Sequence, residues 1–207
     1  WRRTHDPYRI LVSEVMLQQT QVSRVLPKYQ EFLALFPNVS ALAQATPAEV
    51  LRAWKGMGYN RRALYLQRTA QAIVDTHRGI FPNSEKELIK LPGLGIYTAR
   101  ALLVFAYKHD VSLVDTNIRQ IITHYFFSDS PQKETIIRDM ADQLVPKNKS
   151  WQWHQALMDF GALALPPTMN HQRRTPSIPF KETNRYFRGR IMDVLRECAM
   201  EEDRLIK

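Results

Sequence analysis

The segment at residues 84–99 places the tightest constraint on the fold of this chain. Ser84 followed three residues later by Glu87 is the pattern of a helix N-terminus closed by a capping box. The run Leu-Pro-Gly-Leu-Gly-Ile-Tyr-Thr-Ala then ends that helix, turns through Gly93 and Gly95, and begins a second helix at the next isoleucine. The pattern predicts two helices joined by a glycine turn, a helix-hairpin-helix.

The two glycines predict a binding role for this turn. Gly93 and Gly95 can adopt positive φ angles and leave no side chain between the backbone N–H groups and an approaching anion. The helix that begins at Ile96 and includes Thr98 adds unpaired amides and the positive end of the helix dipole. An ordinary turn between packed helices is the alternative. We expect these four residues to bind a DNA phosphate.

The charge balance favours a polyanionic partner. The 207 residues carry a net charge of +9, and residues 1–110 hold 15 Lys and Arg against 8 Asp and Glu, so +7 of the surplus lies on the half that contains the hairpin. Solvated surface cations are the alternative. The single cysteine, Cys198, excludes an internal disulfide and a multi-thiolate metal site built from this chain alone. No apolar run approaches the roughly 18 residues that span a membrane.

Helical signals extend along almost the whole sequence. Asp6 before Pro7, and Thr46 before Pro47 with Glu49 as a capping box, are N-caps with proline at the first helical position. Prolines at positions 27, 37, 47, 82 and 92 are expected to divide the first half into short helices. In the second half we expect helices at 118–126, 132–144, 151–163 and 185–196, and a loop at 166–183. The sequence therefore predicts an all-α fold.

Two carboxylates are candidates for catalysis. Glu14 lies inside the run Ile-Leu-Val-Ser-Glu-Val-Met-Leu, where an ionised side chain is costly unless it is paired or functional. Burial would raise its pKa and keep it protonated near neutral pH. A glutamate at the helix rim that pairs with Arg2 or Arg9 is the alternative. Asp115 precedes a predicted helix, where it is either a simple N-cap or a catalytic carboxylate that stays ionised.

These features together suggest one class of reaction. Glycoside hydrolysis uses an acid that assists the leaving group and a carboxylate that stabilises an oxocarbenium-like sugar. On a basic helical chain with a phosphate site, Glu14 and Asp115 fit these two roles. The sequence therefore predicts cleavage of an N-glycosidic bond in DNA.

Five segments extend this interpretation. They are Asp6–Tyr8 with Ser13–Val22, Gly56–Tyr59, Leu91–Ala99, Val114–Asn117 and Met158–Ala162. Over about residues 1–165 they closely resemble the adenine DNA glycosylases (the MutY family) of the helix-hairpin-helix, or endonuclease III, superfamily. The resemblance implies a two-lobed all-α fold. A six-helix barrel lobe at 1–110 would carry the hairpin, a second helical lobe at 111–207 would carry the catalytic Asp, and the DNA cleft would lie between them.

The resemblance also implies roles for single residues. Glu14 would protonate N7 of a flipped adenine, and Asp115 would stabilise the C1′ cation or form a transient covalent bond. Tyr97 would line the pocket, and Asn117 would hydrogen-bond the catalytic water or Glu14. The residues expected to contact the extruded base are Arg2, Leu17 and Thr20, and those expected to wedge into the space that it leaves are Gln19 and Tyr59. The endonuclease III lineage has a Schiff-base lysine at position 97, so a tyrosine there implies a monofunctional glycosylase.

The chain departs from the family pattern in three ways. The family's iron-sulfur cluster uses cysteines spaced C-x6-C-x2-C-x5-C, but the corresponding residues here are Leu165, Gln172, Thr175 and Lys181. We therefore expect no cluster and no metal. Arg173, Arg174 and Lys181 either keep a DNA-contacting role in this loop or have none.

The other departures concern base recognition. Nothing after Lys207 supplies the family's Nudix-like domain, which reads 8-oxoguanine, so recognition of the opposite base is expected to be weaker or delegated. Thr116 replaces the usual glycine, and Asn60 replaces a second tyrosine after Tyr59. These two changes bear on the base specificity rather than on the glycosylase activity.

The expected activity is hydrolysis of adenine mispaired with 8-oxoguanine or guanine. A thymine or uracil mismatch glycosylase is one alternative, although a pyrimidine has no N7 for Glu14 to protonate. A non-catalytic damage binder is another, although it would tolerate loss of either carboxylate. The expected partner is double-stranded DNA with a mismatched or damaged base, with no cofactor and no membrane. We expect a monomer, cytoplasmic at the nucleoid of a prokaryote or nuclear in a eukaryote.

Overall fold

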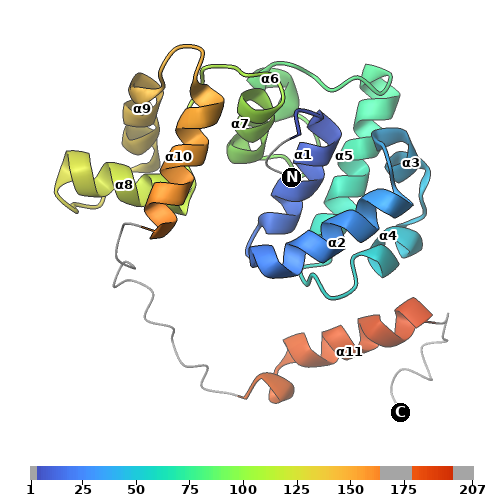
Figure 1. Cartoon of the computed structure of the whole chain (residues 1–207). Coiled ribbons are helices and arrows are strands. Elements are labelled where there is room, and N and C mark those ends of the chain that lie inside the picture. The colour runs from blue at the N-terminus through green and yellow to red at the C-terminus, as the bar shows by residue number, and fades with distance from the viewer. Residues whose placement is uncertain (1–3, 164–178, 198–207) are drawn as a thin grey trace.

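The structure is a computed structural model that describes residues 4–163 and 179–197, and all regular structure within them is helical. This confirms the predicted all-α class. In chain order the elements are α1 (Pro7–Leu17), α2 (Val22–Leu35), α3 (Val39–Gln44), α4 (Pro47–Ala53), α5 (Arg61–His77), α6 (Glu85–Leu88), α7 (Ile96–Phe105), α8 (Thr116–Phe127), α9 (Glu134–Leu144), α10 (Ser150–Leu163), the 3-10 turn η1 (Phe180–Glu182) and α11 (Asn184–Glu197) (Figure 1). Across the described ranges, no helix has the length and apolar character needed to cross a membrane.

Local capping explains where several helices begin. The Asp6 side chain accepts hydrogen bonds from two N–H groups in the first turn of α1, which starts with Pro7. Thr46 and Glu49 form the expected capping box of α4, and Ser84 caps α6. Each of these contacts joins residues no more than three apart, so the sequence pattern is sufficient to predict them.

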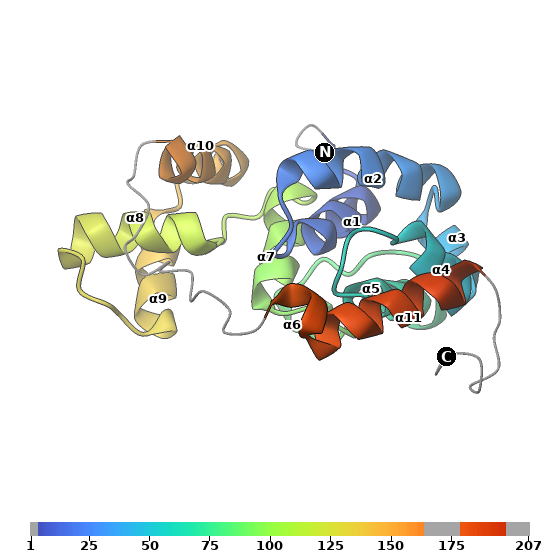
Figure 2. The same cartoon turned by 90° about the horizontal axis from the view of Figure 1, so that it is seen from below.

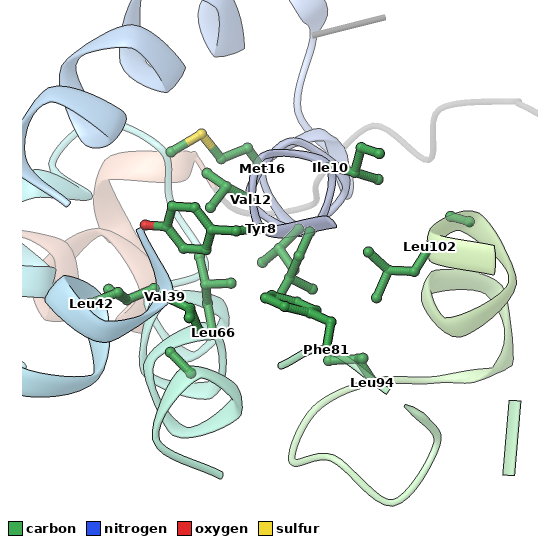
Figure 3. Close-up of a cluster of buried hydrophobic side chains, with 14 of the residues drawn as sticks. Tyr8, Ile10, Val12, Met16, Val39, Leu42, Leu66, Phe81, Leu94 and Leu102 are labelled. Atoms are coloured by element: carbon green, nitrogen blue, oxygen red, sulfur yellow. The ribbon is translucent and has the colours of Figure 1, made fainter. Parts of the chain in front are cut away.

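The larger hydrophobic core lies among α1–α7 and takes buried side chains from every one of these helices. Figure 3 shows them gathered around α1, with Tyr8, Val12 and Met16 on one side of this helix and Leu102 of α7 on another. An apolar run that leaves a helix hydrophobic on most sides favours its complete burial. Buried residues extend without a break from Ile10 to Met16, so α1 is a central helix, and Glu14 lies within it.

A smaller core joins α8, α9 and α10 beside the first group (Figures 1 and 2). Its buried residues are Ile118, Ile122, Ile137 and Ala141. Helix α11 contacts α4 of the larger group rather than adding to this smaller core (Figure 2). The lobe boundaries proposed from the sequence stay a prediction.

Two expectations about helices and loops are corrected. Pro27 lies inside α2 and does not end a helix. A proline removes one backbone hydrogen bond, but Val25, Tyr29 and Phe32 of the same helix are buried in the core and hold it together. Within the loop expected at 166–183, residues 180–182 form η1, whereas residues 164–178 lie outside the described part of the chain.

An arginine connects the two groups of helices. Arg100 of α7 donates from Nε to Glu85 of α6 at 2.7 Å and from Nη1 to Asp142 of α9 at 2.9 Å. Nη1 also donates to the hydroxyl of Ser112, whose N–H in turn donates to Asp142. Both groups of helices therefore hold the segment that leads to Asp115.

A buried histidine holds the same segment from the other side. His154 of α10 accepts the N–H of Leu113 at Nε2, 2.9 Å away. Its Nδ1 lies 2.6 Å from the carbonyl oxygen of Ser150, so Nδ1 carries the proton and the ring is neutral. Burial lowers the pKa of His154, which favours this neutral form.

Candidate active site

A cavity of about 450 Å³ opens where α1, α10 and the first turns of α7 and α8 meet. All four residues that were expected to be catalytic line it: Glu14, Tyr97, Asp115 and Asn117. Part of the remaining wall is formed by Leu17 of α1, by Gln18 directly after it, and by Trp151, Gln155 and Met158 of α10. The fold thus brings together side chains from four separate segments of the chain.

Glu14 has the properties of a proton donor at neutral pH. Its side chain is buried at the third turn of α1. Burial raises its pKa from 4.5 to about 7, a hydrogen bond from Tyr97 opposes that rise, and the nearby Asp115 charge adds to it. The alternative in which Glu14 lies at an exposed helix rim is wrong, because its side chain is buried and lines the cavity.

Asp115 is the N-cap of α8 and faces the same cavity. Its Oδ1 accepts the N–H of Ile118 at 2.7 Å, so the capping role and the position in the cavity belong to the same side chain. Burial raises the pKa of Asp115, and the backbone N–H groups that it accepts oppose that rise. The helix N-terminus alone would have lowered this pKa, and the burial that outweighs it leaves no local sequence pattern.

Tyr97 lies near both carboxylates and hydrogen-bonds one of them. It is the second residue of α7, and its hydroxyl donates a hydrogen bond to Glu14. Burial and the two neighbouring carboxylates raise the pKa of Tyr97 well above its usual range. The side chain is therefore a neutral hydrogen-bond donor throughout the physiological pH range.

A glycine sets the position of Asn117. A Cβ atom on Gly161 of α10 would lie 2.7 Å from the Cβ of Asn117, which is closer than two such atoms can approach. Only glycine therefore lets α10 pack this tightly against the first turn of α8. This contact gives a physical reason for the Met-Asp-Phe-Gly-Ala segment that the sequence analysis singled out.

The expected base-contacting residues are not all in the cavity. Leu17 lines it, whereas Thr20 does not, and the Thr20 hydroxyl accepts a hydrogen bond from Arg62 at 3.1 Å. Gln19 and Tyr59 lie in the loops after α1 and α4 and are exposed, as residues meant to enter DNA must be. Arg2 lies outside the described residues.

The hairpin differs from expectation at one glycine. Gly93 has a φ of +81°, and a Cβ there would lie 2.6 Å from the Cβ of Tyr65, so this position requires glycine twice over. Gly95 is the N-cap of α7 with a φ of −92°, so the expected positive φ at Gly95 is wrong. A Cβ on Gly95 meets no protein atom within 4 Å. Packing within the described residues therefore does not require glycine at this position.

The remaining hairpin residues present their backbone. Thr98 is 3% exposed, so only its N–H group could face a phosphate, whereas Ile96 is 43% exposed. The first N–H groups of a helix have no partner within it. The first N–H groups of α7 therefore have no partner within the helix, and phosphate binding by them stays a prediction.

Sequence reasoning missed two residues that organise this region, Arg62 and His154. Arg62 contacts backbone more than forty residues away, and His154 contacts Leu113 across a similar separation. Neither contact leaves a local pattern. The spacing of Trp151, Gln155 and Met158 places them on one face of a helix, but it does not say what that face covers.

The residues present do not fit the iron-sulfur cluster of the resembled family. The four corresponding positions hold no thiol, and three of them, Leu165, Gln172 and Thr175, lie outside the described residues together with Arg173 and Arg174. Lys181 is exposed in η1. Among the described residues, no three His, Cys, Asp or Glu side chains gather as a metal site.

Known proteins resemble this chain over most of its length. Residues 12–147 match the family described as HhH-GPD superfamily base excision DNA repair protein. An adenine DNA glycosylase of Mycolicibacterium smegmatis is 37% identical over 96% of this chain and 75% of its own length. Another, from Buchnera aphidicola, is also 37% identical, over 79% of this chain and 47% of its own length. A thymine/uracil-DNA glycosylase of Methanothermobacter thermautotrophicus is 29% identical over 81% of this chain and 77% of its own length.

Solved structures show the same fold. A thermostable thymine-DNA glycosylase is 29% identical, has a TM-score of 0.76, and covers 82% of this chain and 80% of its own. A trapped endonuclease III–DNA covalent intermediate has a TM-score of 0.71 at 20% identity, covers 84% of this chain and 80% of its own, and is informative about the fold alone. The chain belongs to the HhH-GPD superfamily of base excision DNA repair proteins, as a relative of its adenine DNA glycosylases.

Proposed function

We propose that this protein is a monofunctional DNA glycosylase that hydrolyses the N-glycosidic bond of adenine paired with 8-oxoguanine or guanine in duplex DNA. The observation that carries the proposal is the buried Glu14, which shares one cavity with Asp115 and Tyr97. An acid with a pKa of about 7 can hold a proton for a leaving base and release it at physiological pH. Such an acid and a second carboxylate are the two groups that the reaction needs.

The reaction divides between the two carboxyl groups. Glu14 donates its proton to N7 of an adenine that has been extruded into the cavity, and the C1′–N9 bond breaks as the neutral base leaves. Asp115 places its carboxylate toward the cationic sugar and stabilises it until water adds at C1′. Tyr97 donates its hydrogen bond to the carboxylate form of Glu14, and so stabilises the charge that remains after the proton has left.

Tyr97 limits the reaction to base removal. A Schiff base with C1′ needs an amine, and strand cleavage follows from it. A tyrosine hydroxyl offers no such chemistry. The product is therefore an abasic site in an intact strand. We further propose that the chain works without an iron-sulfur cluster, since it has one cysteine in total.

A thymine or uracil mismatch glycosylase is the second candidate, favoured by the 29% identity to the thymine/uracil-DNA glycosylase and by Thr116 in the cavity wall. Glu14 argues against it. A pyrimidine has no N7 to protonate, and a buried glutamate with no use for its proton would only cost stability.

The hairpin is proposed to hold the backbone of the same duplex through Gly95 and the first N–H groups of α7. Gly93→Ala should destabilise the fold because of its positive φ and its contact with Tyr65. Gly95→Ala should fold normally and weaken binding to all duplexes alike, because its Cβ meets only the DNA. Titrations of both variants with undamaged duplex, beside thermal unfolding, separate the two effects. Unchanged affinity of Gly95→Ala would rule out this phosphate site.

The substrate is tested by single-turnover base release from four duplexes, carrying adenine opposite 8-oxoguanine, adenine opposite guanine, thymine opposite guanine and uracil opposite guanine. Release of adenine, with strand breaks only after alkali treatment, supports the proposal. Release of pyrimidines alone supports the second candidate. Tight binding without release from any of them would indicate a damage binder, and equal rates opposite 8-oxoguanine and guanine would show that the opposite base is not recognised.

A further inference from the structure

Two loops beside the cavity share an unusual backbone. Gln19, after α1, has a φ of +54°, and Tyr59, after α4, has a φ of +47°. Left-handed backbone is uncommon outside glycine and is strained for a bulky side chain, so the surroundings must hold both residues in place. These are the two residues that the sequence resemblance assigns to the space left by the base.

One guanidinium contacts both loops. Arg62, the second residue of α5, donates hydrogen bonds from its two terminal nitrogens to oxygen atoms on either side. The acceptors are the carbonyl oxygens of Val15 (2.8 Å), Met16 (3.0 Å), Gln18 (2.6 Å), Met57 (3.0 Å) and Gly58 (3.3 Å), and the hydroxyl of Thr20 (3.1 Å). Gln18 and Thr20 lie on either side of Gln19 in the chain, and Met57 and Gly58 are the two residues before Tyr59.

Aromatic contacts complete the arrangement. The Arg62 guanidinium carbon lies 5.5 Å from the centroid of the Tyr59 ring and 5.4 Å from that of Trp54. Trp54 is fully buried and donates from Nε1 to the carbonyl oxygen of Gly58 at 3.0 Å. The second loop is therefore fixed to the core on one side and to Arg62 on the other.

The same guanidinium also reaches the catalytic helix. Val15 and Met16 directly follow Glu14, and their carbonyl oxygens belong to the last turn of α1, where no helical N–H is available to them. Arg62 thus caps the end of the helix that carries Glu14. It has no role in the chemistry described above, because it does not line the cavity.

We propose that Arg62 is the positioning residue that holds Gln19 and Tyr59 at a fixed separation, so that both enter the duplex together as the base moves into the Glu14 cavity. The proposal rests on the proposed function. The N–H groups on the two terminal nitrogens of Arg62 lie in one rigid plane and suit acceptors on two sides of the group, whereas the three donors of a lysine ammonium come from a single point. Arg62→Lys keeps the charge and loses this geometry.

The experiment compares Arg62→Lys with the matched control Arg61→Lys. Arg61 is the preceding residue, is exposed, and contacts the hydroxyl and ring of Tyr65 instead of the two loops. Single-turnover adenine release is measured on two duplexes, with the adenine paired opposite guanine or placed opposite an abasic site. The second duplex has no base pair to break, so extrusion is easier.

We expect Arg62→Lys to slow release from the paired duplex by about tenfold or more, and from the abasic duplex by less than about threefold. Arg61→Lys should match wild type on both. Equal slowing on both duplexes would overturn the proposal, because a general structural defect does not depend on the pairing of the target. Release at the wild-type rate from the paired duplex would overturn it too.

A double-mutant cycle provides a second test that does not depend on how well one variant folds. If Arg62 acts through the wedge, Arg62→Lys should add less than about twofold to the loss already caused by Tyr59→Leu. Additive losses would contradict this. Failure of the wild-type protein to release any base would instead refute the proposed function, so the two failures are distinguishable.

Discussion

The two helix groups bury titratable side chains of opposite kinds. The core of α1–α7 surrounds an acid, Glu14, whose pKa is raised, and the group of α8–α10 buries a base, His154, whose pKa is lowered. Burial disfavours the charged form in both cases. Lowering the pH therefore stabilises the folded protein through Glu14 and destabilises it through His154.

The difference shows what each region contributes to the site. A protonated acid needs apolar walls that do not rearrange, and the larger core provides them around α1. The carboxylate that stabilises a cation needs backbone N–H groups and a fixed entry segment. The N–H groups that Asp115 accepts come from the start of α8, and the segment that leads to Asp115 is held by His154 and Arg100.

The largest expected effect comes from removing the catalytic carboxylate of either helix group, Glu14 in α1 or Asp115 at the start of α8. Glu14→Gln should slow adenine release by about 10²–10⁴-fold, the usual contribution of a general acid. Asp115→Asn should slow it by about 10²–10³-fold through loss of charge stabilisation. Asparagine is as good an N-cap as aspartate, so α8 should remain intact. Single-turnover base release measures both variants.

The control for these variants is affinity for undamaged duplex, which should stay unchanged because neither side chain belongs to the hairpin. Wild-type turnover by Glu14→Gln would contradict the role of Glu14 as the acid. The same result for Asp115→Asn would leave Asp115 as a structural cap alone.

The second effect concerns stability: the substitution Glu14→Gln, which should impair activity, should make the folded protein more stable. The pKa of Glu14 is about 7 in the folded protein against 4.5 in an unfolded chain, so the folded state binds more protons between these values and loses stability as the pH rises through them. At one pKa unit per 1.4 kcal/mol, the ionised side chain costs roughly 3 kcal/mol above pH 7. Glu14→Gln should therefore raise the free energy of unfolding at pH 8 and have little effect at pH 4. Urea denaturation at both pH values tests this, and an equal gain at both would refute it.

A third prediction addresses the smaller group. His154→Leu leaves the buried N–H of Leu113 without an acceptor, which should cost about 1–3 kcal/mol. In the wild-type protein, the lowered pKa of His154 means that the folded state binds fewer protons, so this contribution is present above pH 6.5 and is lost as the pH falls. The hydrogen-exchange protection factor of the Leu113 amide, which compares its rate with the intrinsic rate at the same pH, should be lower in the variant and, in the wild type, should fall as the pH is lowered.

The matched control is His124→Leu in α8. His124 pairs with Asp129 at 3.0 Å on the surface, and its side chain is 45% exposed, so its loss should change little. Unchanged protection of Leu113 in His154→Leu would show that the hydrogen bond does not hold the segment before Asp115.

The contrast between local and distant contacts also explains which features could be predicted. The caps at Asp6, Thr46 and Ser84, and the hairpin turn between α6 and α7, depend on residues a few positions apart, so their signals lie within short sequence windows. Glu14 was identifiable because an acid in an apolar run is unusual. Resemblance to a family, rather than periodicity, supplied the roles of Tyr97 and Asn117.

Features that depend on packing between distant segments were not predictable. Pro27 remains helical because the core holds α2, and Gly93 packs against Tyr65, which lies 28 residues earlier in the chain. The pKa of Asp115 reflects burial that its place at a helix start does not reveal. Arg62 is one of many arginines in the sequence, and only the fold shows that it connects two loops.

The smallest expected effect, about tenfold per pH unit, is also the most specific. If Glu14 must be protonated, single-turnover release should reach a plateau just below pH 7 and fall tenfold per unit above it. Protonation of Asp115 should reduce the rate at acid pH. Because burial raises the pKa of Asp115, this loss should begin at a pH above the ordinary value of 3.8.

Tyr97→Phe removes the hydrogen bond that lowers the pKa of Glu14, so the alkaline limb should move to higher pH. Asp115→Asn removes a charge that raises this pKa, so any residual activity should have its limb at lower pH. Opposite shifts would identify Glu14 as the titrating acid, because a group elsewhere in the protein has no reason to respond to both neighbours in opposite directions, whereas an unmoved limb in both variants would assign it to another group.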